Sequence, residues 1–121
     1  MGNIGTLQVE GLLGLSFYRD EMSIMESRLI EVSDKNTGFE TSLGVEHFQN
    51  QFMLQRNNIS ELRHKINKHI QKMGSDMMIY GGQIDKKLLE EDNLLTEEYK
   101  RLEKIIKDLR HEFNEFLIKW M

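Results

Sequence analysis

Apolar residues recur at alternating intervals of three and four along two long stretches of this chain. A mean spacing of about 3.5 residues keeps one side of a helix turned toward a partner helix, as in a coiled coil, and we call such a row a seam. One seam comprises Val45, Phe48, Phe52, Gln55, Ile59, Leu62, Ile66, His69 and Met73. The other comprises Leu95, Tyr99, Leu102, Ile106, Leu109, Phe113, Phe116 and Trp120. Both stretches are therefore predicted to be long helices.

A third and shorter seam lies nearer the N-terminus. It comprises Leu15, Tyr18, Met22, Met25, Leu29 and Val32. Gly38 follows it and favours the left-handed backbone that ends helices, and the Gly81-Gly82 pair favours a second turn. We therefore expect helices at about 15–34, 43–74 and 85–120, with the second reversal between residues 74 and 83.

Residues 1–14 form an apolar arm that glycine interrupts at positions 2, 5, 11 and 14. Each glycine in a helix interior costs about 1 kcal/mol relative to alanine. We therefore expect a weak helix at best in the arm, and a single helical domain over residues 15–121. Because the apolar residues of the arm still favour burial, we expect the arm to pack against another surface.

Charged residues beside the seams predict how the helices pair. The second helix carries the basic residues Arg56, Arg63, Lys65 and Lys72, and the third carries the acidic residues Glu91, Glu98, Glu103 and Glu112. Short connections make consecutive helices antiparallel. The fold expected is an all-α, antiparallel, coiled-coil-like three-helix bundle, made of a long hairpin over residues 43–119 and a shorter first helix. A turn centred near residue 79 places Arg56 beside Glu103.

The difference in predicted helix length favours self-association. A first helix over 15–34 leaves the hairpin around 66–95 uncovered, unless the arm or a second chain covers it. Helical proteins with an open seam usually dimerise, so we expect a homodimer. Large apolar residues clustered at the second turn favour a contact surface for another protein there. They are Met73, Met77, Met78, Ile79 and Tyr80.

Composition narrows the class of protein. The chain has 121 residues, of which 39% are hydrophobic and 30% charged, and it has no proline to interrupt a helix. It has no cysteine, which fits a reducing, cytoplasmic location. No stretch approaches the ~20 apolar residues of a membrane span. The net charge of −4 argues against binding to nucleic acid.

Two Glu-x-x-His-like motifs resemble the ligand spacing of metal-binding helical bundles. They pair Glu61 with His64 and Asp108 with His111. Each histidine lies two positions beyond a seam leucine and therefore on the outer face, whereas the ligands of a bundle-core metal must project inward. A metal-binding bundle is thus an alternative, while the interpretation we favour has no metal and no cofactor.

Gln55 and His69 are the polar exceptions on the seam of the second helix. Polar residues at such positions often fix register or oligomeric state. A histidine there could respond to pH, although one near a helix end more often reaches water with its polar edge. We therefore expect the polar edge of His69 to reach water, and we treat Gln55 and His69 only as polar residues of the seam.

A basic row on the second helix supports one more alternative. It comprises Arg56, Arg63, Lys65, Lys68 and Lys72. Such a row could contact nucleic acid or an acidic membrane surface, but aromatic residues for base stacking are missing from it. No nucleophile motif or phosphate-binding loop is present in the sequence, so an enzyme is not expected. The sequence favours a non-enzymatic helical interaction module, such as an adaptor, scaffold or assembly factor.

Overall fold

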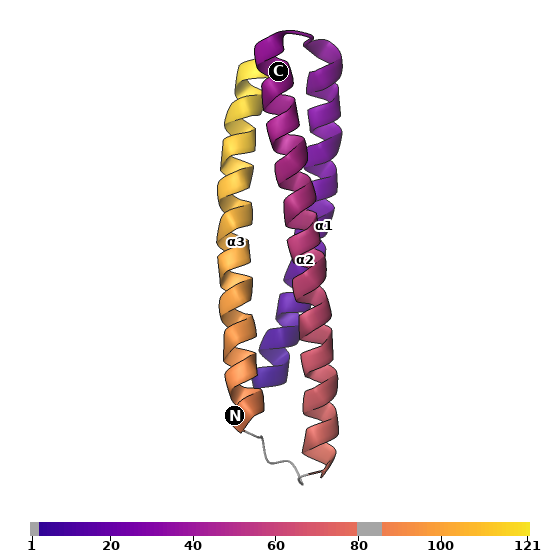
Figure 1. The fold of residues 1–121 in the computed structure, drawn as a ribbon, viewed down its shortest axis with the longest axis vertical. Coiled ribbons are helices and arrows are strands. Elements are labelled where there is room, and N and C mark those ends of the chain that lie inside the picture. Colours follow the sequence, from indigo (N-terminus) through magenta and orange to yellow (C-terminus); the bar gives the residue numbers. More distant parts are fainter. Residues whose placement is uncertain (1–2, 80–85) are drawn as a thin grey trace.

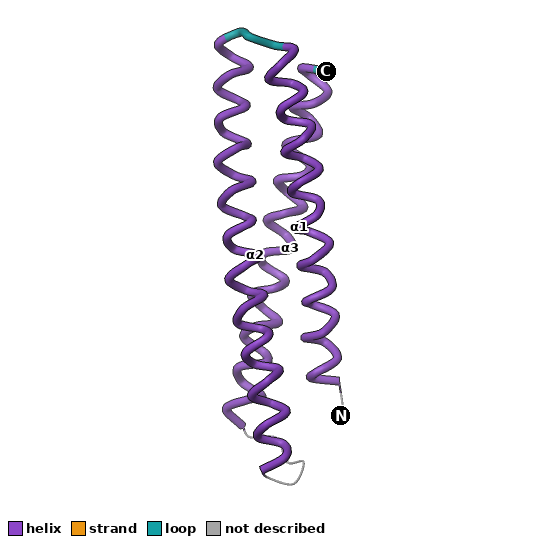
Figure 2. The backbone as a smooth tube through the Cα atoms, turned by 90° about the vertical axis from the view of Figure 1, so that its right-hand side faces the viewer, coloured by secondary structure: helices purple, strands orange, loops and turns teal. Residues whose placement is uncertain are grey.

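Three long helices, each antiparallel to the next, form the structure. This computed structural model describes residues 3–79 and 86–121, with side chains for 8–74 and 86–121. The helices are α1 (Asn3–Lys35), α2 (Phe39–Ile79) and α3 (Lys86–Trp120). They lie side by side in one elongated bundle, and the α1–α2 connection is at the end opposite Ile79 and Lys86 (Figure 1, Figure 2). The predicted all-α three-helix bundle is confirmed.

The core consists of the three predicted seams. Every residue of the seams over 15–32 and 45–73 is buried, including Gln55 and His69. On α3 the seam is buried at Leu95, Leu102, Ile106, Leu109 and Phe113, and partly buried at Tyr99, Phe116 and Trp120. Aromatic rings meet edge to face between α2 and α3, with 5.1 Å between the ring centroids of Phe52 and Phe113. The apolar periodicity therefore identified the packed faces correctly.

The N-terminal arm is helical, contrary to the weak helix expected. Helix α1 includes it from Asn3 without a break at Leu15. A Cβ atom at Gly14 would overlap the Tyr99 hydroxyl, so glycine at this position lets α1 approach α3 closely. Burial against the hairpin then offsets the low helix propensity of these glycines.

Helix α1 also covers the end of the hairpin that was expected to be uncovered. Gln8 is buried and contacts residues of α3 near its start, and Ile66 of α2 lies 3.7 Å from the Cβ position of Gly11. Helix α2 continues through Gly74 to Ile79, so the reversal lies between Ile79 and Lys86. The difference in helix length from which we expected a homodimer is therefore small.

Ion pairs between the helices follow the predicted charge pattern only in part. Lys65 pairs with Glu98 at 3.1 Å, and Lys72 pairs with Glu91 at 3.7 Å, as the basic and acidic flanks predicted. The expected pair of Arg56 with Glu103 is wrong, because Arg56 contacts Glu26 of α1 at 3.0 Å. A helix in a three-helix bundle has two neighbours, and this arginine lies on the side that faces α1.

Two tyrosines join α1 to α3 through a carboxylate. The Tyr18 hydroxyl donates a hydrogen bond of 2.6 Å to Glu103, and the ring of Tyr99 lies 6.5 Å from that of Tyr18. Burial raises the pKa of Tyr18 above the ordinary 10.0, and its hydrogen bond to Glu103 adds to the rise. Burial, followed by the charge of Glu103, also raises the pKa of Tyr99. The fold therefore holds both phenols neutral at a pH where free tyrosine ionises.

Alkaline pH should destabilise the protein through these phenols. In the unfolded chain they ionise near pH 10, whereas in the fold they keep their protons, so stability falls as pH rises above about 10. We expect urea unfolding to show a steeper loss of stability between about pH 9 and 11 for the natural chain than for Tyr18→Phe. Equal slopes for the two proteins would contradict this assignment.

No helix in the described part of the chain combines the length and the apolar run needed to cross a membrane.

Candidate functional site

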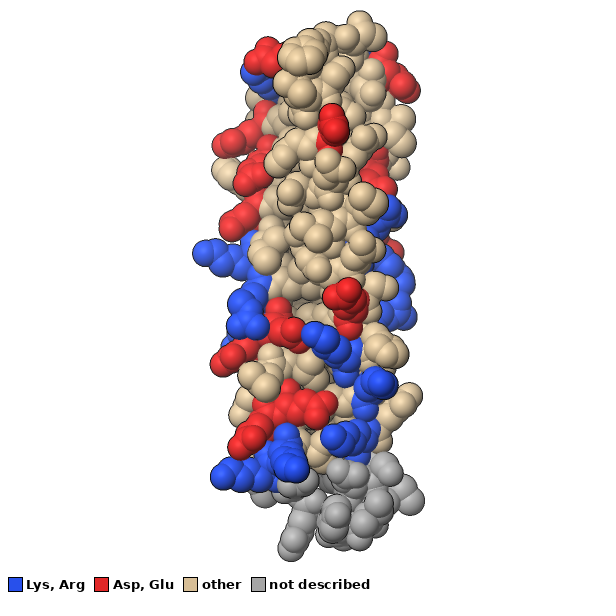
Figure 3. Space-filling model, in the orientation of Figure 1, with Lys and Arg blue, Asp and Glu red and all other residues tan. Residues whose placement is uncertain are grey.

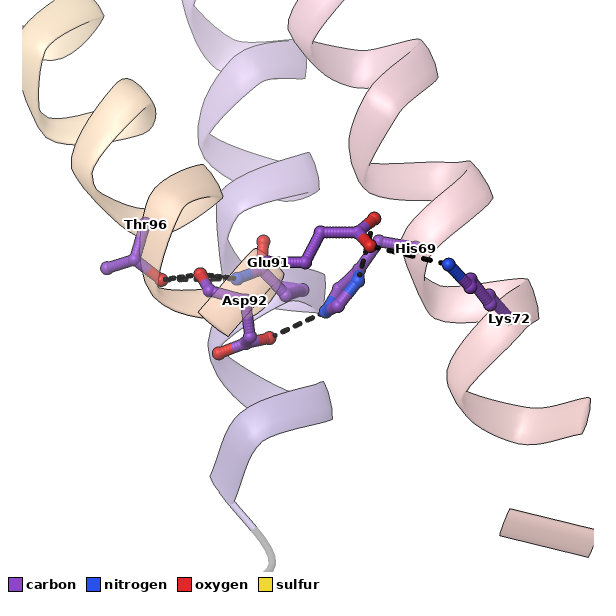
Figure 4. Close-up of polar contacts among 6 residues, drawn as sticks. His69, Lys72, Glu91, Asp92 and Thr96 are labelled. Atoms are coloured by element: carbon purple, nitrogen blue, oxygen red, sulfur yellow. Dashed lines mark hydrogen bonds and ion pairs between the residues drawn. The ribbon is translucent and has the colours of Figure 1, made fainter. Parts of the chain in front are cut away.

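The most deeply buried polar contact joins the seams of α2 and α3. The His69 side chain has no exposed area and Asp92 is 2% exposed, and Nε2 of the ring lies 3.1 Å from Oδ1 of the carboxylate (Figure 4). The distance is that of a hydrogen bond between an imidazole nitrogen and a carboxyl oxygen. A buried pair of this kind fixes the register of α2 against α3, because a shift of either helix would leave both groups unpaired.

The second nitrogen of the His69 ring faces another acidic residue. Glu91 Oε1 lies 3.2 Å from Nδ1, which is within ion-pair distance, although the geometry does not make a hydrogen bond. The other oxygen of Glu91 lies 3.7 Å from Lys72 Nζ, and this pair is half exposed (Figure 4). The histidine is therefore placed between a buried carboxylate and a surface ion pair.

Helix α1 joins the cluster through Gln8. Its Nε2 donates to the main-chain carbonyl of Asp92 at 3.2 Å and to the Thr96 hydroxyl at 3.1 Å. Thr96 also donates to the same carbonyl at 2.9 Å (Figure 4). Hydrogen bonds from all three helices therefore meet at one level of the bundle, where they hold the N-terminal part of α1 on the hairpin.

An open groove lined by α2 and α3 alone runs past this cluster. It contains two hollows of about 200 and 410 Å³, and Lys65 and Glu98 line both. Leu62, Leu95 and Leu102, which line the groove, belong to the buried core. Leu94 and Ile105 also line it and remain 62% and 46% exposed. The groove thus combines apolar surface with charged rims.

The larger hollow has an excess of positive charge. It is lined by Lys65, Lys68 and Arg101 and by Glu91 and Glu98. Both glutamates have lysine partners, whereas neither Lys68 nor Arg101 has an ion-pair partner among residues 8–74 and 86–121. On the face seen in Figure 3, charged side chains gather over the lower half, while the middle of the upper half is largely uncharged.

Some residues predicted as sites have different surroundings from those expected. Gln55 is buried and accepts a hydrogen bond of 3.2 Å from Asn58 on its own helix, so it has no polar partner on another helix within the described residues. Met73 is buried in the bundle, which removes it from the predicted contact surface. The side chains of Met77, Met78 and Ile79, and all of Tyr80, lie outside the described residues.

Both Glu-x-x-His-like motifs face solvent, as the register predicted. Glu61, His64, Asp108 and His111 are all exposed, and His111 contacts Glu115 on its own helix at 3.2 Å. No group of three or more metal-ligating side chains occurs in the part of the chain that the structure describes. Of the basic row on α2, Arg56, Lys65 and Lys72 are paired with glutamates, which leaves fewer free charges for nucleic acid or a membrane.

Asp92 and Gln8 are the members of the cluster that sequence reasoning missed. Asp92 lies three residues before Leu95 and extends the seam of α3 by one position, and Gln8 lies in the arm that was not expected to form a full helix. One signal for the His69–Asp92 pair was present in the sequence. The midpoint of residues 69 and 92 falls at the Tyr80–Gly81 bond, so a turn centred there places the two polar seam residues opposite each other.

Comparisons with protein-family models, with curated proteins and with solved structures return no match to this chain.

Proposed function

We propose that the protein is a non-enzymatic interaction module, an adaptor, scaffold or assembly factor, that receives an amphipathic helix in the α2–α3 groove. The observation that carries this proposal is the groove itself, which leaves Leu94 and Ile105 exposed beside a floor of core leucines. An amphipathic helix laid in such a groove buries its apolar side, as the fourth helix of a four-helix bundle does.

The buried cluster supports a structural role better than a catalytic one. His69 has no exposed area, Asp92 is 2% exposed, and the main-chain carbonyl of Asp92 accepts hydrogen bonds from Gln8 and Thr96. A general acid or base must reach within about 3 Å of a substrate atom. These side chains have no such access to a substrate. We therefore assign them the role of holding α2 and α3, which form the groove, in one register.

The reason for expecting self-association changes once α1 and the groove are taken into account. The homodimer was expected because one end of the hairpin seemed uncovered, and α1 covers that end from Gln8 onward. The outer side of the α2–α3 hairpin stays open among the described residues. A partner is therefore expected along the length of this groove.

A photo-crosslinking amino acid placed at Leu94 should trap the partner in cells. Leu94 lines the larger hollow, whereas Met53, the matched control, is a similarly exposed apolar residue that lines the groove between α1 and α2. We expect one discrete adduct from position 94, at a yield about tenfold above that from position 53. Equal labelling from both positions, or no adduct from position 94, would contradict the proposal.

A further inference from the structure

An exposed apolar stripe runs along the side of α1 opposite its seam. We call Val9, Leu13, Phe17, Asp20 and Ile24 the outer stripe. At 100° per residue, these five positions all fall within less than a quarter of the helix circumference. Its four apolar members are between 48% and 68% exposed. Large apolar side chains gathered on one exposed helix face are typical of a contact surface.

Asp20 is the one charged member of the outer stripe. Beyond Ile24 the charge on the same face is mixed, because Glu31 and Asp34 are accompanied there by Lys35. The one ion pair that Asp20 makes among the described residues is with Arg19, at 4.0 Å, and both side chains are about half or more exposed. Such an exposed ion pair contributes little free energy, so the Asp20 carboxylate can exchange it for an ion pair with another molecule.

We infer that the outer stripe of one molecule docks in the α2–α3 groove of a second copy of this chain, an inference that rests on the proposed function. The Asp20 carboxylate of the stripe complements the larger hollow, in which Lys68 and Arg101 have no acidic partner among the described residues. Complementary charge of this kind selects and orients partners, while the apolar residues supply the affinity.

The dimensions of the two surfaces agree. The outer stripe covers residues 9–24, or about 22 Å of helix at 1.5 Å per residue, and the α3 side of the groove covers residues 91–105, or about 21 Å. A contact of about four helical turns falls at the small end of specific interfaces, below ~1,200 Å². The association is therefore expected to be weak, in the micromolar range of concentration.

The position of the two surfaces determines the kind of assembly. Helix α1 packs against both α2 and α3 on one side of the hairpin (Figure 1, Figure 2). The apolar residues of the outer stripe are exposed and lie on the side of α1 opposite its buried seam, so the stripe faces away from the hairpin. The stripe and the groove therefore lie on opposite sides of the bundle, and two molecules cannot satisfy both contacts reciprocally. Such a heterologous contact adds molecules one after another instead of closing a two-fold dimer.

Sedimentation of two complementary variants tests this assembly. We expect the average mass of the natural chain to rise past that of a dimer as concentration increases, and Phe17→Glu and Leu94→Glu each to remain monomeric. An equimolar mixture of the two variants should form a 1:1 complex and stop there, because each supplies the surface that the other lacks. If both variants are monomeric and their mixture forms no complex, the proposed contact between stripe and groove is wrong.

Charge reversal tests whether Asp20 of the outer stripe meets the basic residues of the larger hollow. Asp20→Arg and Arg101→Asp should each weaken association about tenfold, and the chain carrying both changes should regain most of it. Met53→Glu, on the groove between α1 and α2, should leave association unchanged. All substituted positions are exposed, and circular dichroism verifies that each variant keeps its helices.

The failure of this inference is distinguishable from failure of the proposed function. A natural chain that stays monomeric at every concentration, while Leu94 still crosslinks to a different protein in cells, would overturn the second-copy assignment and leave the groove as a binding site. A closed dimer that Phe17→Glu abolishes and Leu94→Glu does not would likewise overturn it, in favour of contact between two α1 helices.

Discussion

Replacing His69 with leucine should lower the free energy of unfolding by about 3 kcal/mol, because it leaves a buried carboxylate without its partner. The Asp92 side chain is almost completely buried, and its one hydrogen bond among the described residues comes from the His69 ring. Urea unfolding at neutral pH, followed by circular dichroism, measures the loss. Leucine is close to histidine in volume, so lost packing contributes little to this difference.

The double variant His69→Leu, Asp92→Leu should recover most of that stability, to within about 1 kcal/mol of the natural chain. Both positions lie on apolar seams, where leucine fits the surroundings. As a control, His111→Leu removes a histidine that also faces a carboxylate at 3.2 Å but is exposed, and it should change stability by less than about 0.5 kcal/mol. Additive losses in the double variant would show that the two residues do not act as a pair.

Replacing Phe113 with alanine should have an effect of similar or larger size, a loss of about 4 kcal/mol. Phe113 is completely buried, and its ring contacts those of Phe48, Phe52 and Phe116 at centroid distances from 5.1 to 6.2 Å. The substitution removes both the buried apolar area and the edge-to-face contacts between α2 and α3. The midpoint of thermal unfolding should fall by about 16 °C.

Phe39→Ala is the matched control for this prediction. Phe39 begins α2 and is 79% exposed, so its removal should shift the thermal midpoint by no more than about 2 °C. If the two alanine variants unfolded at similar temperatures, the aromatic contacts of Phe113 would not be the main support of this end of the bundle.

The seams were predictable because burial in a helical bundle depends on one period. Apolar residues such as Phe52 and Ile66 recur at each turn along one face of the helix. Because apolar surface is unfavourable in water, that face packs against the other helices. The same register placed His64 and His111 on the outside, and both are exposed. Local periodicity thus predicted the fold class and the outward position of these two histidines.

The arm and the Arg56 pairing were mispredicted because they depend on the neighbouring helices. Intrinsic propensity counts Gly14 as a helix breaker, whereas here a side chain would overlap Tyr99 and glycine is the residue that permits contact. A basic flank does not indicate which of two neighbouring helices supplies its acid, so Arg56 was assigned to α3 but contacts α1. Each error was made where a third helix supplies the contact.

By itself the sequence determined that this protein is three helices packed along heptad seams, since a 3.5-residue period is a property of consecutive residues. Only the tertiary structure decided that His69 meets Asp92, that Gln8 closes the cluster, and that the α2–α3 groove stays open with Lys68 and Arg101 beside it. Those features depend on the position of the turn and on which side of the hairpin α1 occupies. The glycine pair indicated the turn only to within several residues, and contacts between distant residues decide which side of the hairpin α1 occupies.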